Sequence, residues 1–261
     1  MGSLSAKVVV VTGGNQGIGL AIARAMAAQG AAVAICARTQ TSLDAAADEI
    51  RALDADCVAL ACDVADPDST DAMAETVLAR FGRVDVVVAN AGIAGAIRPM
   101  HELTHNEWRE CIAVDLDGVY LTFRRFIPVM IAGGVGGSLI ALSSMTGKRP
   151  LPGRTPYAAA KMGVIGLVRS LALELGPYGI TVNSVCPGAV AGARLDRVVA
   201  QQADALGISG EESLRRFSDP AALKRPTRAD EVAAACVFLA TDAGSGITGE
   251  DMNVSAGLVM Y

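Results

Sequence analysis

The sequence predicts an α/β fold, a doubly wound parallel sheet of about seven strands with helices on both faces. Two observations predict it. Short runs rich in Val, Ile and Ala recur along the chain, as expected of strands buried on both faces. Segments with apolar residues at helical spacing lie between them. Strands that alternate with helices are typical of a parallel sheet with right-handed crossovers.

The strands and helices follow one another in order along the chain. The predicted strands are Val8–Val11, Ala32–Ala37, Val58–Ala61, Val84–Ala89, Leu139–Leu142, Ile180–Val185 and Met252–Val254. The predicted helices are one that carries Ile18, Ile22 and Met26, then Leu43–Leu53, Ser69–Phe81, Asn106–Ile131, Pro156–Leu175 and Ala229–Ala240. Thr104 and Glu107 form a capping-box pattern, and Thr227 is a candidate cap for the helix after Pro226.

No linker or repeat interrupts this order, so we expect one domain over residues 1–261. A polar stretch at about residues 189–225 is inserted after the sixth strand. It lies beyond the carboxyl end of a strand, where open α/β sheets bind ligands, and we expect it to cover a substrate. The alternative is a surface excursion without a role.

Composition excludes several classes of protein. The chain has 261 residues, of which 52% are hydrophobic and 19% charged, with a net charge of −5. Disorder is excluded, and the acidic balance argues against a nucleic-acid partner. No run of 18 apolar residues and no signal-peptide pattern occurs, so we expect a cytoplasmic protein without a membrane span. The six cysteines stand singly and the histidines number two, which predicts reduced thiols and no metal site.

A glycine-rich loop follows the first strand and opens a helix. Gly13, Gly17 and Gly19 allow a tight turn and a close approach of the backbone to a ligand, and the helix start favours a pyrophosphate. We expect a dinucleotide here, with Asn15, Gln16 and Ile18 also in the loop. No Lys-Ser or Lys-Thr pair follows, which disfavours a P-loop. The alternative is a structural turn.

The ends of the second and third strands bear on the choice of cofactor. Arg38 and Thr39 stand where dinucleotide-binding sheets commonly place an acid that holds the ribose, so Arg38 is a candidate partner for a 2′-phosphate. This favours NADP(H), with NAD(H) possible; the alternative is a solvated surface arginine. Gln16 provides no second basic residue. Asp63 and Val64 are candidates to meet the adenine, or to cap the next helix.

Tyr157 and Lys161 are four residues apart in a predicted helix and therefore share one face. An ammonium beside a phenol stabilises the phenolate, which makes the tyrosine a usable general acid and base. The chain has only four lysines, so this spacing is informative. Thirteen residues before Tyr157, Ser144 follows the fifth strand, where its hydroxyl can hold a substrate oxygen.

Together these motifs resemble the short-chain dehydrogenase/reductase family over nearly the whole chain. The matching positions are Thr12–Gly19, Asp63, Asn90-Ala91-Gly92, Ser144, Tyr157, Lys161, Asn183 and Pro187-Gly188. The resemblance implies a Rossmann fold in which Tyr157 is the general acid and base, Lys161 assists it and Ser144 positions the reacting oxygen. It also implies that the cofactor lies against Asn90, Ala91, Gly92, Val114, Pro187, Gly188 and Val190, besides Tyr157 and Lys161.

Three positions depart from the family pattern. Asp115 matches the asparagine that supports the lysine in the family; we count it among the catalytic candidates, although it brings a charge near Lys161. Gly192 replaces the usual threonine after Pro-Gly. Ser255-Ala256-Gly257 stands where the family usually has Gly-Gly.

The sequence therefore predicts an oxidoreductase that transfers a hydride between NADP(H) and a secondary alcohol or ketone. The alternatives are an NAD-dependent dehydrogenase of a polyol or cyclic alcohol, and a cofactor-binding regulatory protein with weak activity. Arg149, Arg154 and Arg194 are candidates to receive an anionic substrate, the alternative being solvated loop arginines. The resemblance also implies a homo-tetramer or homo-dimer built on the helices at Asn106–Ile131 and Pro156–Leu175.

Overall fold

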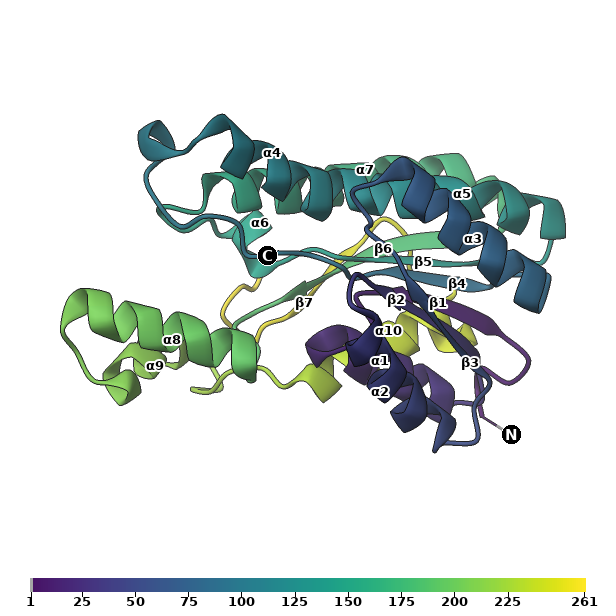
Figure 1. Ribbon diagram of the computed structural model, residues 1–261, viewed down its shortest axis with the longest axis horizontal. Coiled ribbons are helices and arrows are strands. Elements are labelled where there is room, and N and C mark those ends of the chain that lie inside the picture. The colour runs from purple at the N-terminus through teal and green to yellow at the C-terminus, as the bar shows by residue number, and fades with distance from the viewer. Residues whose placement is uncertain (1) are drawn as a thin grey trace.

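The computed structural model describes residues 2–261, so Met1 of the predicted domain lies outside the described residues. Its centre is a sheet of seven parallel strands in the order β3-β2-β1-β4-β5-β6-β7 (Figure 1). The strands are β1 (Val8–Thr12), β2 (Ala32–Ala37), β3 (Cys57–Ala61), β4 (Val86–Ala89), β5 (Gly137–Leu142), β6 (Ile180–Pro187) and β7 (Asp251–Val254). All seven predicted strands are confirmed, within two residues at each end.

Helices cover both faces of the sheet (Figure 1). One face carries α1 (Gly17–Ala28), α2 (Gln40–Arg51) and α10 (Ala229–Ala240). The other carries α3 (Pro67–Phe81), α4 (His105–Ile112), α5 (Gly118–Gly133) and α7 (Thr155–Leu175). The short α6 (Met145–Lys148) lies beside α7, and α8 (Ala193–Leu206) and α9 (Gly210–Ser218) form the insertion. The predicted doubly wound α/β fold is confirmed.

The apolar alternation within each strand builds two cores. Val9 and Val11 of β1 belong to the cluster under α1, α2 and α10, whereas Val8 and Val10 belong to the cluster under α3, α5 and α7. All four side chains are buried. Successive side chains of a strand point to opposite faces, so a strand covered on both faces must be apolar throughout.

The chain reverses its direction of winding between β1 and β4. The strands β1 to β3 extend the sheet one way and β4 to β7 extend it the other way, so β1 and β4 are neighbours. At such a point the loops after the two strands separate and leave a crevice at the carboxyl ends, where ligands bind in this class of sheet. Thr12 and Ala89 end these two strands.

The predicted helix at Asn106–Ile131 is not one regular helix. A π-helical turn, η2 (Ala113–Asp117), separates α4 from α5. A π turn inserts a residue into the helix and rotates the side chains that follow, and such turns are frequent at functional sites. Asp115 lies in this turn. The capping box of Thr104 and Glu107 at the start of α4 is confirmed.

The two ends of the insertion are joined to each other at the carboxyl edge of the sheet. Val190 and Thr227 form a parallel bridge between the two ends of the insertion. Its hydrogen bonds run from Ala191 N to Thr227 O at 2.8 Å and from Thr227 N to Ala189 O at 2.8 Å. The Thr227 hydroxyl donates to Val254 O of β7 at 3.2 Å. The predicted capping role of Thr227 is therefore wrong, because its side chain is used to join the insertion to β7.

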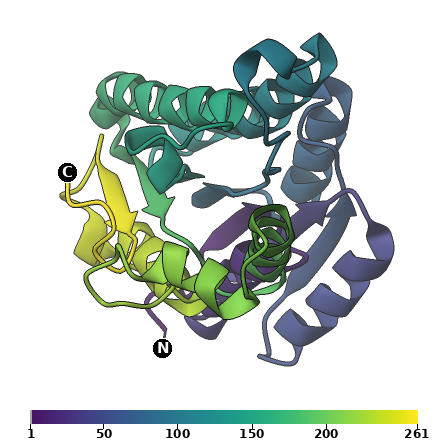
Figure 2. The ribbon, with the colours of Figure 1, turned by 90° about the vertical axis from the view of Figure 1, so that its left-hand side faces the viewer.

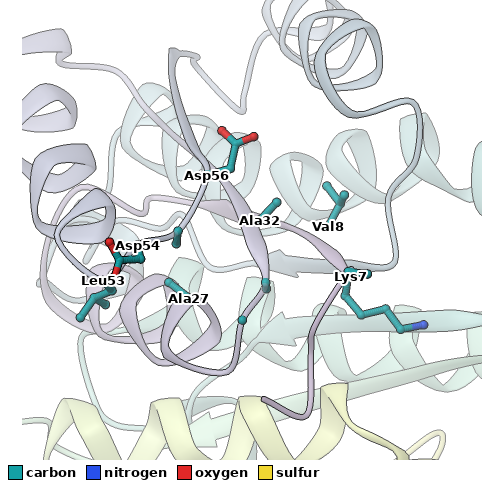
Figure 3. A pocket seen from close by; sticks show the side chains of 11 residues that line it. Lys7, Val8, Ala27, Ala32, Leu53, Asp54 and Asp56 are labelled. Atoms are coloured by element: carbon teal, nitrogen blue, oxygen red, sulfur yellow. The ribbon is translucent and has the colours of Figure 1, made fainter. Parts of the chain in front are cut away.

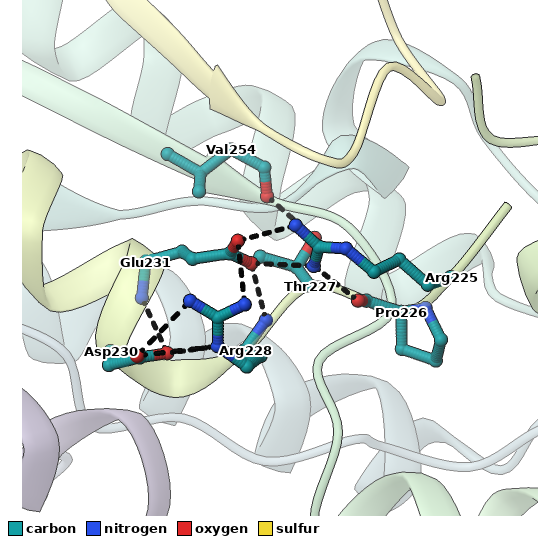
Figure 4. A network of polar contacts seen from close by, with 7 residues as sticks. All are labelled: Arg225, Pro226, Thr227, Arg228, Asp230, Glu231 and Val254. Carbon is teal, nitrogen blue, oxygen red and sulfur yellow. Dashed lines mark hydrogen bonds and ion pairs between the residues drawn. The ribbon is translucent and has the colours of Figure 1, made fainter. Parts of the chain in front are cut away.

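The helix after the insertion is capped by other residues (Figure 4). Arg228 is the N-cap of α10, and the Glu231 carboxylate accepts its backbone N–H at 2.8 Å. Arg225 donates two hydrogen bonds to the same carboxylate, at 2.6 and 3.0 Å. Hydrogen bonds from Arg225 and Arg228 lower the pKa of Glu231 to about 2. The insertion and α10 are thus fixed to each other by a charged cluster.

A hollow of about 260 Å³ lies at the amino ends of the strands, lined by Lys7, Val8, Ala32, Asp54 and Asp56 among others (Figure 3). This edge of the sheet is opposite to the crevice between β1 and β4, so the hollow is separate from the candidate site. All six cysteines are free and buried. Within residues 2–261 no helix is long and apolar enough to cross a membrane, and no cluster of three metal-ligating side chains occurs.

Candidate active site

The glycine loop after β1 is a closely packed turn. Gly13 and Gly17 have φ of +65° and +56°, in the left-handed region that favours glycine. A methyl group on Gly19 would lie 2.1 Å from the carbonyl oxygen of Gly13, so this position admits no side chain. A methyl group on Gly17 would meet nothing within 4 Å, so the loop is open on that side. Backbone amides at the start of α1 are thereby accessible, which fits a pyrophosphate.

Asn90 joins the two loops that flank the crevice. Its side-chain amide donates to Thr12 O at 2.8 Å, and the Thr12 hydroxyl accepts the backbone N–H groups of Asn90 and Ala91, each at 3.0 Å. These bonds hold the end of β4 against the glycine loop. A methyl group on Gly13 would lie 2.9 Å from the Asn90 amide nitrogen. The predicted cofactor-binding residues of β1 and β4 are thus brought together.

The second predicted group lies along the outer edge of the same crevice. Arg38 and Thr39 follow β2 and are exposed, and Arg38 makes no ion pair within residues 2–261. Asn15 of the glycine loop donates to the Ser42 hydroxyl at 2.9 Å, and that hydroxyl donates to Thr39 O at 2.9 Å. This chain of bonds fixes the glycine loop relative to the Arg38 turn. Sequence reasoning missed Ser42, which only the fold brings next to Asn15.

Asp63 and Val64 follow β3. The Asp63 carboxylate accepts the N–H of Ala65 at 3.0 Å in a local turn, and Asp66 is the N-cap of α3. The proposed capping role of Asp63 is therefore wrong. Val64 is buried, and a methyl group on Gly118 would lie 2.8 Å from its side chain. The alternative role, contact with an adenine, stays a prediction.

Lys161 brings a buried positive charge next to Tyr157. Its side chain is only 4% exposed, and its ammonium donates to Leu142 O of β5 at 2.9 Å. The ammonium lies 5.7 Å from the centroid of the Tyr157 ring. The Ser143 hydroxyl donates to the carbonyl oxygen of Lys161 at 2.7 Å, which joins α7 to the end of β5. The ammonium and the phenol ring are therefore neighbours on one face of α7, one helical turn apart.

Ser144 lies at the start of α6. As the N-cap of α6, its hydroxyl oxygen accepts the N–H of Thr146 at 3.1 Å. The hydroxyl proton then remains free to donate to another oxygen. A methyl group on Gly147 would lie 2.9 Å from the backbone of Lys161, so α6 packs closely on α7. This packing holds Ser144 on the side of α7 that carries Lys161.

Asp115 is fully buried in the π turn. Its Oδ1 accepts the N–H of Ile93 at 2.7 Å, and its Oδ2 accepts the thiol of Cys111 at 3.9 Å. A methyl group on Gly92 would lie 2.8 Å from Asp115 Oδ1 and 3.5 Å from Lys161 Nζ, so the two charges are near neighbours. Burial raises the pKa of Asp115, and the charge of Lys161 only partly offsets this. Burial and Asp115 together raise the pKa of Cys111 to about 12.

Three of the remaining predicted residues follow or end β6, and the fourth, Val114, lies in η2. Pro187 ends β6 and is buried, and a methyl group on Gly188 would lie 2.9 Å from the Cα of Ser255. Val190 takes part in the bridge to Thr227. Val114 is half-buried and packs against the core under α3, α5 and α7. Pro187, Gly188 and Val190 thus lie at the carboxyl edge of the sheet, where Ser144 also follows β5.

The buried charge of Asp115 gives a testable change in stability. The pKa of Asp115 in the folded protein lies above the ordinary value of 3.8. The contribution of this carboxyl to the free energy of unfolding therefore falls as the pH rises through that pKa. Asn keeps the oxygen that accepts from Ile93 but has no charge. We expect Asp115→Asn to raise the free energy of unfolding by about 1 kcal/mol at neutral pH. The gain should shrink toward acid pH in urea titrations of both proteins.

A loss of stability at neutral pH in the Asn variant would contradict this expectation, because attraction between Asp115 and Lys161 would then outweigh the cost of burial.

Comparisons with known proteins agree with this geometry. A family model described as Enoyl-(Acyl carrier protein) reductase matches residues 13–259. A putative ketoacyl reductase of the granaticin polyketide synthase from Streptomyces violaceoruber is 37% identical over 264 residues, covering 100% of this chain and 96% of the relative. Among solved structures, an actinorhodin polyketide ketoreductase variant with NADPH has a TM-score of 0.94 at 32% identity and covers 100% of both chains.

Carveol dehydrogenase from Mycobacterium avium in complex with NAD also has a TM-score of 0.94, at 31% identity and 99% coverage of both chains. The family match spans nearly the whole chain, and these relatives act on ketone or alcohol groups by their names. The chain therefore belongs to the short-chain dehydrogenase/reductase family, as an oxidoreductase of CH–OH and keto groups.

Proposed function

We propose that this protein transfers a hydride between NADP(H) and a secondary alcohol or ketone, with Tyr157 as the general acid and base. The contact of the Lys161 ammonium with the Tyr157 ring, at 5.7 Å, carries the proposal. The buried ammonium of Lys161 donates one hydrogen bond to Leu142 O, which leaves two N–H groups that can face the Tyr157 phenol and a ribose of the cofactor. The proposed unit is one domain over residues 1–261, with the insertion at 189–225 over the substrate.

The chain's own residues would handle the proton and the substrate oxygen. In the direction of reduction, the Tyr157 hydroxyl gives its proton to the carbonyl oxygen, and the phenolate left behind is stabilised by Lys161. The free hydroxyl proton of Ser144 donates a hydrogen bond to the same oxygen and stabilises the charge that develops there. Oxidation of the alcohol follows the same path backwards, with the phenolate as base. Asp115 acts on Lys161 and touches neither reacting group.

The residues present fit a dinucleotide. Gly13, Gly17 and Gly19 leave an open backbone surface at the start of α1, and Gly92 leaves no side chain between Asp115 and the crevice. When bound, the nicotinamide supplies or accepts the hydride. Arg38 is exposed and lacks an ion pair within the described residues, as expected of a partner for the 2′-phosphate of NADP(H). The solved relatives include one with NADPH and one with NAD, so both cofactors occur among them.

Two alternatives make different predictions. An NAD-dependent dehydrogenase of a polyol or cyclic alcohol is favoured by the likeness to carveol dehydrogenase in complex with NAD. It would oxidise such alcohols with NAD faster than with NADP. A cofactor-binding regulatory protein is suggested by Asp115, Gly192 and Ala256, which depart from the family pattern. It would bind NADPH without any change in nicotinamide absorbance across a panel of ketones and alcohols.

The proposed reaction depends on the phenol of Tyr157. We expect Tyr157→Phe to lower kcat for ketone reduction by about 10²- to 10⁴-fold, the usual contribution of a general acid, while the Kd for NADPH stays unchanged. Stopped-flow or steady-state absorbance gives the rates and fluorescence titration gives the Kd. Tyr178→Phe, an exposed tyrosine outside the site, is the matched control. Undiminished turnover in the Tyr157 variant would refute the assignment.

Arg38 tests the choice of cofactor. We expect Arg38→Ala to weaken binding of NADPH by about 1.5 to 3 kcal/mol, because a charged hydrogen bond to the 2′-phosphate is lost, and to leave NADH binding nearly unchanged. Arg24→Ala is the control, since Arg24 is exposed on α1 and paired with Glu49. The measurement is a calorimetric titration with each cofactor. Equal losses for NADPH and NADH would show that Arg38 does not recognise the phosphate.

We also propose a cytoplasmic homo-tetramer or homo-dimer. The outer face of α7 carries Met162, Gly166 and Leu173, of which Leu173 is 84% exposed. Met162 and Leu173 are exposed apolar side chains, and Gly166 between them lets a neighbouring helix approach closely, which favours an interface between subunits. We expect Leu173→Arg to shift the assembly to a smaller species in light scattering, with Leu223→Arg, exposed in the insertion, as control. A wild-type monomer at micromolar concentration would contradict the proposal.

A further inference from the structure

Arg154 stacks on the tyrosine at the centre of the candidate site. It is the N-cap residue of α7, and its guanidinium carbon lies 4.5 Å from the centroid of the Tyr157 ring. Lys161 lies 5.7 Å from the same centroid. Two cations therefore accompany one phenol, although Lys161 alone satisfies the chemistry described above. The guanidinium is half-buried and needs a separate explanation.

The polar groups of Arg154 lack partners. Its Nε is buried and makes no hydrogen bond, and within residues 2–261 the side chain makes no ion pair. Burial lowers the pKa of Arg154, and its interactions with Tyr157 and the neighbouring acids do not fully offset this. A half-buried guanidinium with one buried N–H group that lacks a partner is costly, and an anion can supply that partner.

Arg194 carries a further positive charge at this edge of the sheet. It lies in the first turn of α8, the insertion helix that faces α4 and α6 at the carboxyl edge of the sheet (Figure 1, Figure 2). The charge of Arg194 helps to lower the pKa of Arg154 and offsets part of the raised pKa of Asp115, so its field acts on both groups from α8. Arg194 also makes no ion pair within the described chain. Asp196 follows two residues later, and residues two apart on a helix do not face each other.

We propose that Arg154 and Arg194 form a binding subsite for the carboxylate of a short keto acid or hydroxy acid substrate. The inference rests on the proposed function of Tyr157 and adds the substrate class. Guanidinium groups bind carboxylates through paired N–H donors, which fixes the orientation of the substrate. Arg154 lies against the Tyr157 ring, so the carboxylate sits only one or two carbons from the carbonyl that Tyr157 protonates. Arg194 closes the subsite from α8.

The test compares two substrates that differ only in charge, acetoacetate and methyl acetoacetate, with NADPH and with NADH. The variants are Arg154→Gln and Arg194→Gln; the control is Arg197→Gln, one turn along α8, whose Nε donates to Ala193 O at 3.3 Å. We expect kcat/KM of the wild type to favour acetoacetate. Each subsite variant should lose about 10- to 100-fold for acetoacetate and stay within about threefold for the ester. The control should change neither.

The alternative role of Arg154 is to act on the Tyr157 phenol alone. Equal losses for acid and ester in Arg154→Gln, together with a shifted pH profile of kcat, would establish that role and overturn the subsite. A wild type that reduces the ester as well as the acid would also overturn it. Arg194 is exposed, so its variant stays interpretable if Arg154→Gln does not fold.

A binding measurement separates failure of the subsite from failure of the proposed function. Acetoacetate is titrated calorimetrically into two NADPH complexes. One is the complex of Tyr157→Phe, and the other is that of the double variant that carries both Tyr157→Phe and Arg194→Gln. Binding that weakens about 10-fold or more without Arg194 supports the subsite even where the wild type turns over neither substrate. Binding that is equally strong in both variants, or absent in both, overturns the subsite. Reduction of the ester by the wild type would then still support the proposed function.

Discussion

The buried ammonium of Lys161 is the constraint on which the rest of the site depends. A charged group that is only 4% exposed is costly unless other groups satisfy it, and Leu142 O provides the hydrogen bond at 2.9 Å. That bond fixes the first turns of α7 against the end of β5, and the bond from Ser143 to the Lys161 carbonyl strengthens the same contact. Tyr157 lies one helical turn before Lys161, on the same face of α7. The location of the phenol therefore follows from the burial of the lysine.

Close packing around the Lys161 ammonium also involves Asp115 and Gly92. Asp115 approaches it from η2, with only Gly92 between them, and any side chain at position 92 would collide with the carboxylate. The π turn aims Asp115 into this space, where Ile93 N–H and the Cys111 thiol are its hydrogen-bond donors. Three segments far apart in the chain, after β4, in η2 and in α7, thus meet at one point. The three residues that meet are Gly92, Asp115 and Lys161, and the two charged side chains can approach each other only because position 92 has no side chain.

Much of this arrangement could be predicted because it is local or periodic. Buried strands are apolar throughout, so all seven were found, and the spacing of Tyr157 and Lys161 places both on one face of α7. The errors occur where tertiary contacts override a local signal. Thr227 has the chemistry of a helix cap, but Val254 O and the bridge to Val190 use it instead. The π turn leaves no pattern in the sequence, because its residues continue the apolar periodicity of the helix. The contact between Asn15 and Ser42 spans two elements and is invisible before the fold is known.

The balance of charge around Tyr157 links Asp115 with Arg154 and Arg194, which lie far apart in the sequence. In place of the neutral asparagine of the family, Asp115 adds a buried negative charge, which burial alone would penalise. The charges of Lys161, Arg194 and Arg154 each lower its pKa and so offset part of that penalty. Arg154 and Lys161 lie 4.5 and 5.7 Å from the centroid of the Tyr157 ring, so the cations that offset the charge of Asp115 are also the cations beside the phenol. The aspartate and the arginines therefore form one electrostatic set, in which the cations offset part of the cost of the buried carboxylate, while Arg154 and Arg194 make no ion pair within the described residues.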